Sequence, residues 1–165
     1  MTITNPYRMV SFNPSFNRKA FNCKSDPLTR YLQIQASQDI KRRLAACYLA
    51  VTPEDEIAGY YTLAATSVPL PDLPDEIRAK LPRYPTIPAV LMGRLAVDDN
   101  HSGKGLGGAL LFDVIQRSLT AEIAAYAMVV DAKDDEAVAF YRHFGFLSFP
   151  EKPRTLFLPL AGLKI

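Results

Sequence analysis

The chain has 165 residues, of which 48% are hydrophobic and 22% are charged, and its formal net charge is +2. This length and composition predict one folded domain spanning residues 1–165 and exclude a disordered or collagen-like chain. The small positive charge permits a local nucleic-acid patch without requiring one. No apolar run approaches the ~20 residues of a membrane helix and no signal peptide is recognisable, so we expect a cytoplasmic protein without membrane contact.

The two cysteines, Cys23 and Cys47, have neither metal-binding nor redox spacing. We interpret them as small buried side chains in a reducing compartment. No metal site is expected.

The N-terminal part of the chain predicts a short strand followed by a helix. The strand is Met9–Phe12, and the helix begins at Ser25, an N-cap candidate with Pro27 in the first turn. Its apolar stripe runs toward Ile40. The basic cluster Lys41–Arg43 that follows is typical of a solvated helix end, and an RNA-binding face is the alternative.

A hairpin and a proline-rich segment come next. Ala45–Val51 and Ile57–Leu63 predict two antiparallel strands joined by a turn at Thr52–Glu56. The segment Pro69–Pro88, with a short helix predicted at Asp75–Leu81, is long and apolar. Both a substrate-facing lid and a scaffold excursion fit this pattern.

The central stretch Val90–Leu111 has the order strand, glycine-rich turn, helix. Val90–Val97 is an apolar run typical of a buried strand, and Gly103–Gly108 supplies the turn. A helical pattern opens at Ala109 and continues to Leu119. Glycines allow close approach of the backbone, and the amides of the first helical turn point outward, so the stretch predicts a phosphate cradle.

The identity of the phosphate ligand is narrowed by what the turn lacks. Lys104 is followed by Gly105, so the Gly-Lys-Ser/Thr ending of a nucleoside-triphosphatase loop is absent. The G-x-G-x-x-G spacing of a dinucleotide fold is absent as well. The glycines alone are equally typical of a flexible turn, but the flanking strand and helix favour pyrophosphate binding.

The C-terminal part predicts a second buried strand, Ala127–Ala132, parallel to Val90–Val97 through a helical crossover. Asp134 or Asp135 can cap a further helix, which Gly145 ends. Together the elements predict an α/β fold with a mixed sheet. Two closing strands are predicted at Phe146–Phe149 and Thr155–Leu160.

Two motifs in this order resemble the GNAT family of N-acetyltransferases. The turn Ser102–Gly107 is similar to that family's Q/R-x-x-G-x-G/A signature, and Phe140-Tyr141 with Gly145-Phe146 is similar to its late helix-to-strand motif. The chain departs from the pattern at Ser102, where Gln or Arg is usual, and at Asp134, where Asn is common.

The resemblance implies a mostly antiparallel central sheet with a parallel, splayed pair of strands at the cofactor site, flanked by helices. It also implies acetyl-coenzyme A as the acetyl donor, held largely by main-chain groups. The cofactor-binding residues that it implies are Leu95, Ala96 and Val97 for the pantetheine arm and thioester, Ser102, Gly103, Lys104, Gly105, Leu106, Gly107 and Gly108 for the pyrophosphate, and Asp134, Ala137 and Phe140 on the late helix.

Tyr141 is the residue that we expect to donate a proton to the departing sulfur. A phenol with an ordinary pKa near ~10 is protonated at neutral pH and suits a general acid. A packed aromatic beside Phe140 and Phe144 is the alternative. His101 and His143 are interpreted as surface or structural residues, so no general base is assigned.

The resemblance narrows to the acetyltransferase toxins of bacterial toxin–antitoxin pairs. It implies acetylation of the α-amine of aminoacyl-tRNA, which blocks translation, a ribbon-helix-helix antitoxin and a homodimer. A GNAT acetyltransferase of a small-molecule or protein amine is the alternative, and a cofactor-binding sensor without turnover is another. The features that carry this likeness are Phe21-Asn22-Cys23, Gly59–Leu63, Ile87-Pro88-Ala89, Gly93–Val97 and Ala132-Lys133.

Binding of tRNA needs several cations on one face and is salt-dependent. Arg94, beside the thioester strand, is alternatively an internal ion-pair partner. The basic candidates are Arg30, Lys41, Arg42, Arg43, Arg78, Lys80, Arg83, Arg94, Lys133, Arg142, Lys152 and Arg154.

Overall fold

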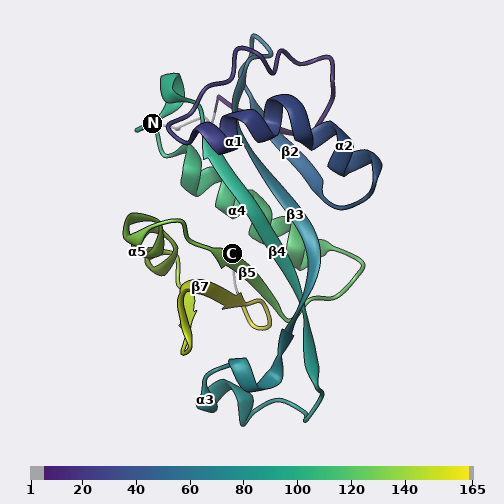
Figure 1. The fold of residues 1–165 in the computed structure, drawn as a ribbon, viewed down its shortest axis with the longest axis vertical. Coiled ribbons are helices and arrows are strands. Elements are labelled where there is room, and N and C mark those ends of the chain that lie inside the picture. Colours follow the sequence, from purple (N-terminus) through teal and green to yellow (C-terminus); the bar gives the residue numbers. More distant parts are fainter. Residues whose placement is uncertain (1–5, 164–165) are drawn as a thin grey trace. The chain divides into compact units, whose positions relative to one another are not determined.

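The computed structural model describes residues 6–163, in which strands and helices alternate around one mixed sheet (Figure 1). The strands are hydrogen-bonded in the order β1-β2-β3-β4-β5-β7-β6. Pairing is parallel between β4 and β5 and antiparallel for β1–β2, β2–β3, β5–β7 and β6–β7. The α/β prediction is confirmed. The strands are β1 (Arg8–Ser11), β2 (Ala46–Val51), β3 (Ile57–Pro69), β4 (Thr86–Val97), β5 (Ala127–Asp131), β6 (Leu147–Phe149) and β7 (Lys152–Pro159).

Among residues 6–163, no helix combines the length and the apolar character needed to cross a lipid bilayer. The helices and helical turns are α1 (Asp26–Arg30), η1 (Tyr31–Gln35), α2 (Ala36–Lys41), η2 (Leu70–Asp72), α3 (Asp75–Arg78), η3 (Asp99–His101), α4 (Leu106–Thr120) and α5 (Asp135–His143).

The first of two compact units contains residues up to 64 together with 93–114. Helices α1 and α2 lie across β2 and β3 (Figure 1) and close a core that includes Phe21, Leu32, Leu49 and Tyr60. The predicted N-cap is confirmed, because the amide of Leu28 donates to the Ser25 hydroxyl at 3.4 Å. A polar cap and a single apolar stripe therefore orient this helix on the sheet.

The first helix is not regular, in contrast to the prediction. A π-helical turn at Tyr31–Gln35 separates α1 from α2, and the Ala36 amide donates to the Tyr31 carbonyl, five residues back. This turn accommodates one residue more than an α-helical turn and buries Tyr31, Leu32 and Ala36. Hydrophobic periodicity does not distinguish such a turn from an α-helix.

The second unit contains residues 65–92 together with those from 115 onward. Its β4–β5 register runs from Ala89↔Ala127 to Met92↔Val130, as the predicted parallel crossover requires. β7 pairs with both β5 and β6, and it begins at Lys152 rather than at the predicted Thr155 because Phe149↔Lys152 closes a tight hairpin.

The proline-rich segment belongs to the core of this second unit. Leu70 and Leu73 are buried in one cluster with Ala127 and Phe157, which favours a scaffold excursion for this part of the segment. Strands β3 and β4 extend into it from both ends, and α3 ends before the predicted Leu81. A residue that precedes proline, as Leu81 precedes Pro82, is disfavoured in the α-conformation, which accounts for the exclusion of Leu81 from the helix.

Candidate functional site

The end of strand β4 is tied to a distant loop by a buried carboxylate. Asp98 directly follows Leu95–Val97 and is only 5% exposed. Its side chain accepts hydrogen bonds from the amides of Asn22 at 2.9 Å and Asn100 at 2.8 Å, and its own amide donates to the Ala58 carbonyl at 2.8 Å. The main chain leaving β4 is therefore fixed from three directions, a role that the sequence did not reveal.

The glycine-rich turn has the backbone conformation of a ligand cradle. Gly103 and Gly105 have φ values of 76° and 78°, in the left-handed region that favours glycine. Helix α4 begins at Leu106, and its first helical hydrogen bond runs from the Ala109 amide to the Gly105 carbonyl. The predicted helix start at Ala109 was therefore wrong. Helix propensity alone disfavours Gly107 and Gly108, which is why the sequence pattern placed the start after them. The backbone amides of residues 106–108 lie before the amide that makes this first bond, in the part of a helix where amides lack partners within the helix.

Ser102, the departure from the family signature, has a local structural role. Its exposed hydroxyl donates to the carbonyl of Asp99 at 3.0 Å and closes the short helical turn η3. Lys104, next along the turn, is exposed. The cradle therefore consists of main-chain groups with one exposed cation beside them.

Gly59 on β3 allows the first turn of α4 to pack closely against the sheet. A Cβ at this position would lie 2.9 Å from the Ala96 carbonyl oxygen, 3.0 Å from Leu110 and 3.3 Å from Leu106. Such distances leave no room for a methyl group. Gly59 thus sets the spacing between β3, the end of β4 and the cradle helix.

In the second unit, Asp134 caps helix α5, as predicted. Its carboxylate accepts a hydrogen bond from the Ala137 amide at 2.8 Å. The negative charge is thereby placed at a helix N-terminus, where it is stabilised.

Replacing Asp134 with alanine is expected to lower the free energy of unfolding by about 1 kcal/mol, because the capped amide loses its partner. Asp135→Ala is the matched control, since it removes the same charge from an exposed side chain paired only with Arg154 at 3.1 Å. That variant should lose only a few tenths of a kcal/mol. Urea denaturation of both variants measures the difference, and equal losses would contradict the capping role.

Tyr141 is a buried phenol on α5. It is 8% exposed, and its ring packs against Phe140 and Phe146 at centroid distances of 5.3 and 5.5 Å. Burial raises the pKa of Tyr141 to about 12. Among residues 6–163, none forms a hydrogen bond with the Tyr141 hydroxyl.

Arg94 was predicted either as a tRNA contact or as an internal ion-pair partner. Its guanidinium carbon lies 3.6 Å from the centroid of the Tyr31 ring. It forms no ion pair with a carboxylate of residues 6–163. The ion-pair alternative is therefore wrong for the described chain, and the observed contact is a cation–π interaction.

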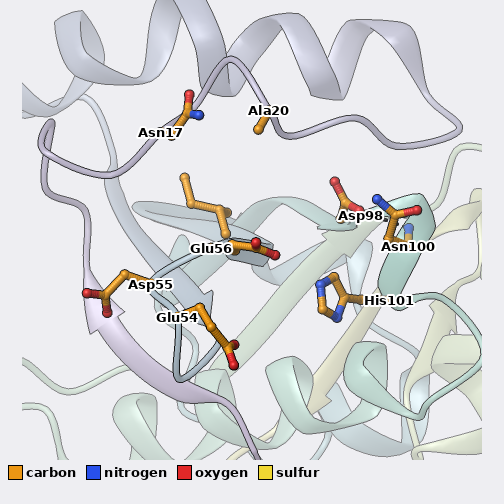
Figure 2. A pocket seen from close by; sticks show the side chains of 9 residues that line it. Asn17, Ala20, Glu54, Asp55, Glu56, Asp98, Asn100 and His101 are labelled. Carbon is orange, nitrogen blue, oxygen red and sulfur yellow. Dashed lines mark hydrogen bonds between the residues drawn. The ribbon is translucent and has the colours of Figure 1, made fainter.

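A cavity of about 360 Å³ lies in the first unit, and Asp98 after β4 is one of the residues that line it (Figure 2). Figure 2 shows Glu54, Asp55 and Glu56 on one side and Asp98, Asn100 and His101 on the other. Asp55 is paired with Arg8 at 2.7 Å, and the His101 ring shares a 2.8 Å hydrogen bond with the Tyr7 hydroxyl. A lining this rich in carboxylates repels a pyrophosphate, so the cavity is not the phosphate cradle. Its residues are Asn17, Ala20, Glu54, Asp55, Glu56, Ile57, Asp98, Asn100 and His101.

The basic cluster Lys41–Arg43 is exposed at the end of α2, with Arg42 as the C-cap. Two of the other candidates are engaged on the surface: Arg78 with Asp75, and Arg154 with Asp135. The basic residues Lys41–Arg43 at the end of α2 and Arg94 on β4 belong to the first unit, which also contains the glycine-rich turn.

The predicted site residues fall into two groups, one in each unit. Leu95–Val97 and Ser102–Gly108 lie together in the first, and Asp134, Ala137, Phe140 and Tyr141 lie together on α5 in the second. Within residues 6–163, no three His, Cys, Asp or Glu side chains are grouped so as to hold a metal ion.

Comparison with known proteins gives consistent matches. Residues 11–146 match the family model described as acetyltransferase (GNAT) family. A protein of Mycobacterium tuberculosis named tRNA-acetylating toxin is 36% identical over 141 residues, which cover 84% of this chain and 83% of the relative. The solved structure of AtaT complexed with acetyl-methionyl-tRNAfMet is 25% identical with a TM-score of 0.86, covering 93% of this chain and 94% of AtaT. AtaTR bound with AcCoA is also 25% identical, with a TM-score of 0.81 and 94% of both chains covered.

Proposed function

Because the chain belongs to the acetyltransferase (GNAT) family, we propose that it transfers acetyl from acetyl-coenzyme A to the α-amine of aminoacyl-tRNA. Such a product cannot enter peptide synthesis through its blocked amine, so the protein acts as a toxin that stops translation. The observation that carries the proposal is the match over 84% of the chain to a relative named for tRNA acetylation. The cytoplasm, which contains charged tRNA, is the proposed location.

The residues of the first unit fit the proposed acetyl donor. The amides from Gly103 to Gly108 are proposed to hold its pyrophosphate. Two glycines in the left-handed conformation, Gly103 and Gly105, form the turn that leads into the N-terminus of helix α4. The main chain of Leu95–Val97 is proposed to hold the pantetheine arm and polarise the thioester carbonyl. When bound, acetyl-coenzyme A supplies an activated acyl group. Ser102 is proposed to support this binding site by closing the helical turn η3, because its side chain is shorter than the Gln or Arg that is usual at this position.

The residues of the second unit fit a general acid. In the proposed reaction the amine nitrogen bonds to the carbonyl carbon of the thioester, and the carbon–sulfur bond breaks. We assign to Tyr141 the role of donating a proton to the departing thiolate. The attacking nitrogen releases a proton to solvent, and solvent returns one to the phenolate, so protons balance. A pKa of about 12 keeps the Tyr141 phenol protonated at physiological pH and excludes it as a base. Ala137 and Phe140 on the same helix are proposed to line the acetyl donor, and Asp134 contributes as the cap.

No side chain is proposed as the base. His101 is engaged with Tyr7, and the His143 ring packs against Phe144 at 5.2 Å. An α-amine with an ordinary pKa near ~8 is partly neutral at physiological pH, so positioning supplies the rest.

The proposal is tested by incubating the full-length protein with labelled acetyl-coenzyme A and three acceptors: charged tRNA, deacylated tRNA and a panel of small amines. Label is expected on charged tRNA alone, and it should be released with the amino acid when the ester is hydrolysed. Label on small amines or on protein, with none on charged tRNA, would establish the alternative acetyltransferase reading. Binding without transfer to any acceptor would identify a sensor.

Two partners are proposed from the resemblance alone: a ribbon-helix-helix antitoxin and a second copy of the chain. Co-expression with a small ribbon-helix-helix protein encoded beside this chain should neutralise its toxicity. Sedimentation of the purified complex measures the copy number.

A further inference from the structure

Arg94 is a half-buried cation with most of its donors available. One face of its guanidinium is stacked on Tyr31, and its Nη1 reaches the Thr62 hydroxyl only at 3.5 Å, the long limit of a hydrogen bond. No carboxylate of the described chain lies within ion-pair distance. A planar guanidinium held by one face and open at its edge is suited to bidentate binding of a phosphate.

The ring under Arg94 is itself fixed by a carboxylate. The Tyr31 hydroxyl donates to Oδ2 of Asp39 at 2.8 Å, and Nε2 of Gln35 donates to Oδ1 of the same carboxylate at 2.9 Å. Both oxygens of Asp39 therefore accept hydrogen bonds, one from the Tyr31 hydroxyl and one from Gln35. A phenol that donates to an anion has a more electron-rich ring, which strengthens its contact with a cation.

The π-helical turn is what aligns these three side chains. Tyr31 and Gln35 are its first and last residues, and Asp39 follows one helical turn later on α2. Turns of this kind are frequent at functional sites. The π-helical turn thus brings Tyr31 and Gln35 to the same carboxylate, that of Asp39, while the Tyr31 ring contacts Arg94.

The polar and ionisable groups around Arg94 do not neutralise its positive charge. Besides Tyr31 and Asp39, these are Cys47 on β2 and Tyr60 and Thr62 on β3. Burial raises the pKa of the Cys47 thiol to about 12 and raises the pKa of Tyr60 as well, so both are neutral. The carboxyl pKa of Asp39 is lowered first by the hydrogen bond from Gln35, then by the one from Tyr31, and further by the charges of Arg94 and Arg42, so this group is anionic. Two arginines and one carboxylate sum to a net positive charge.

We propose that Arg94 binds a backbone phosphate at the single-stranded acceptor end of aminoacyl-tRNA, and that Tyr31 and Asp39 are positioning residues that hold it. This inference rests on the proposed function and assigns the substrate contact to one residue. Arg94 immediately precedes Leu95, so a phosphate bound there lies next to the strand proposed to hold the thioester. A small amine or a protein acceptor has no phosphodiester to place at this position.

Arg94→Gln in the full-length protein is expected to raise the KM for charged tRNA about 10- to 100-fold, while the Kd for acetyl-coenzyme A stays unchanged. The distinguishing measurement is the slope of log(kcat/KM) against log salt. Loss of one phosphate contact on a single strand should make that slope shallower by about 0.7. Arg94→Lys keeps the charge and should keep the slope, with a smaller rise in KM.

The positioning residues are tested separately. Tyr31→Phe and Asp39→Asn keep the Arg94 charge, so the slope should remain that of the wild type while KM rises about 3- to 10-fold. Arg8→Gln is the matched control, because Arg8 is an exposed arginine already paired with Asp55. It should change neither quantity.

The outcomes separate this inference from the proposed function. If the wild-type protein acetylates charged tRNA and the salt slope of Arg94→Gln equals that of the wild type, the phosphate contact is refuted and the function stands. If the wild-type protein acetylates only small amines, the proposed function is refuted, and the inference that rests on it is refuted with it. If Arg94→Gln does not fold, the KM values of Arg94→Lys and Tyr31→Phe decide, and a wild-type KM for charged tRNA in both variants would overturn the inference.

Discussion

The Tyr141→Phe variant is expected to bind acetyl-coenzyme A with wild-type affinity and to lose about 100- to 10,000-fold in turnover on charged tRNA. The substitution removes the hydroxyl and leaves the ring, so the packing against Phe140 and Phe146 is preserved. Stopped-time assays with labelled acetyl-coenzyme A measure the rate, and calorimetry measures the affinity. Because the pKa of Tyr141 is about 12, wild-type turnover should show no alkaline loss from this residue until the pH approaches that value.

Tyr126→Phe is the matched control for this variant. Tyr126 is a second tyrosine of the same unit whose pKa is also raised by burial, and it lies immediately before β5 rather than on α5. Its replacement should leave turnover near the wild-type level. Near-normal turnover of Tyr141→Phe itself would remove Tyr141 from the mechanism, whatever the control does.

The Gly59→Ala variant is expected to lose about 1–3 kcal/mol of unfolding free energy, because its methyl group would meet a main-chain carbonyl that cannot rotate away. The added Cβ would lie 2.9 Å from the Ala96 oxygen. Relief requires α4 or β4 to shift, which would displace the cradle, so the affinity for acetyl-coenzyme A should also fall. Chemical denaturation and calorimetry on the same preparation measure both effects.

Gly93→Ala provides the contrast. A Cβ there would lie 3.3 Å from the Thr62 hydroxyl oxygen, which belongs to a side chain. We expect a smaller loss of stability and no loss of affinity. A Gly59→Ala protein as stable as Gly93→Ala would show that the strands and helix accommodate the methyl group without strain.

Local sequence signals predicted the parts of this structure that depend on neighbouring residues. The order of strand, glycine turn and helix from Val90 onward follows from periodicity and glycine content, and both were visible in the chain. The cap at Asp134 follows from a carboxylate placed before a helical pattern. The start of α4 was missed because glycine lowers helix propensity, whereas in the structure Leu106 and Leu110 of this helix lie close to Gly59 on β3.

The remaining features depend on residues far apart in the chain, which no local pattern reports. Arg94 was recognised as a cation near the thioester strand, but its partner Tyr31 lies on a different element and is presented by a π-helical turn. Asp98 directly follows the predicted strand Val90–Val97, and no local pattern indicates that its carboxylate accepts hydrogen bonds from two amides. Contacts of this kind become visible only when the sheet has been assembled.

The bond between Asn22 and Asp98 joins residues 76 positions apart. The Asp99 amide returns a hydrogen bond to the Asn22 carbonyl, so the link is reciprocal. A link of such sequence separation costs loop-closure entropy and forms only after the intervening strands have come together. We therefore expect the turn proposed to bind pyrophosphate to be ordered only in the folded chain, because an excised strand–turn–helix peptide keeps the glycines but lacks the long-range hydrogen bonds to Asn22 that hold the end of β4.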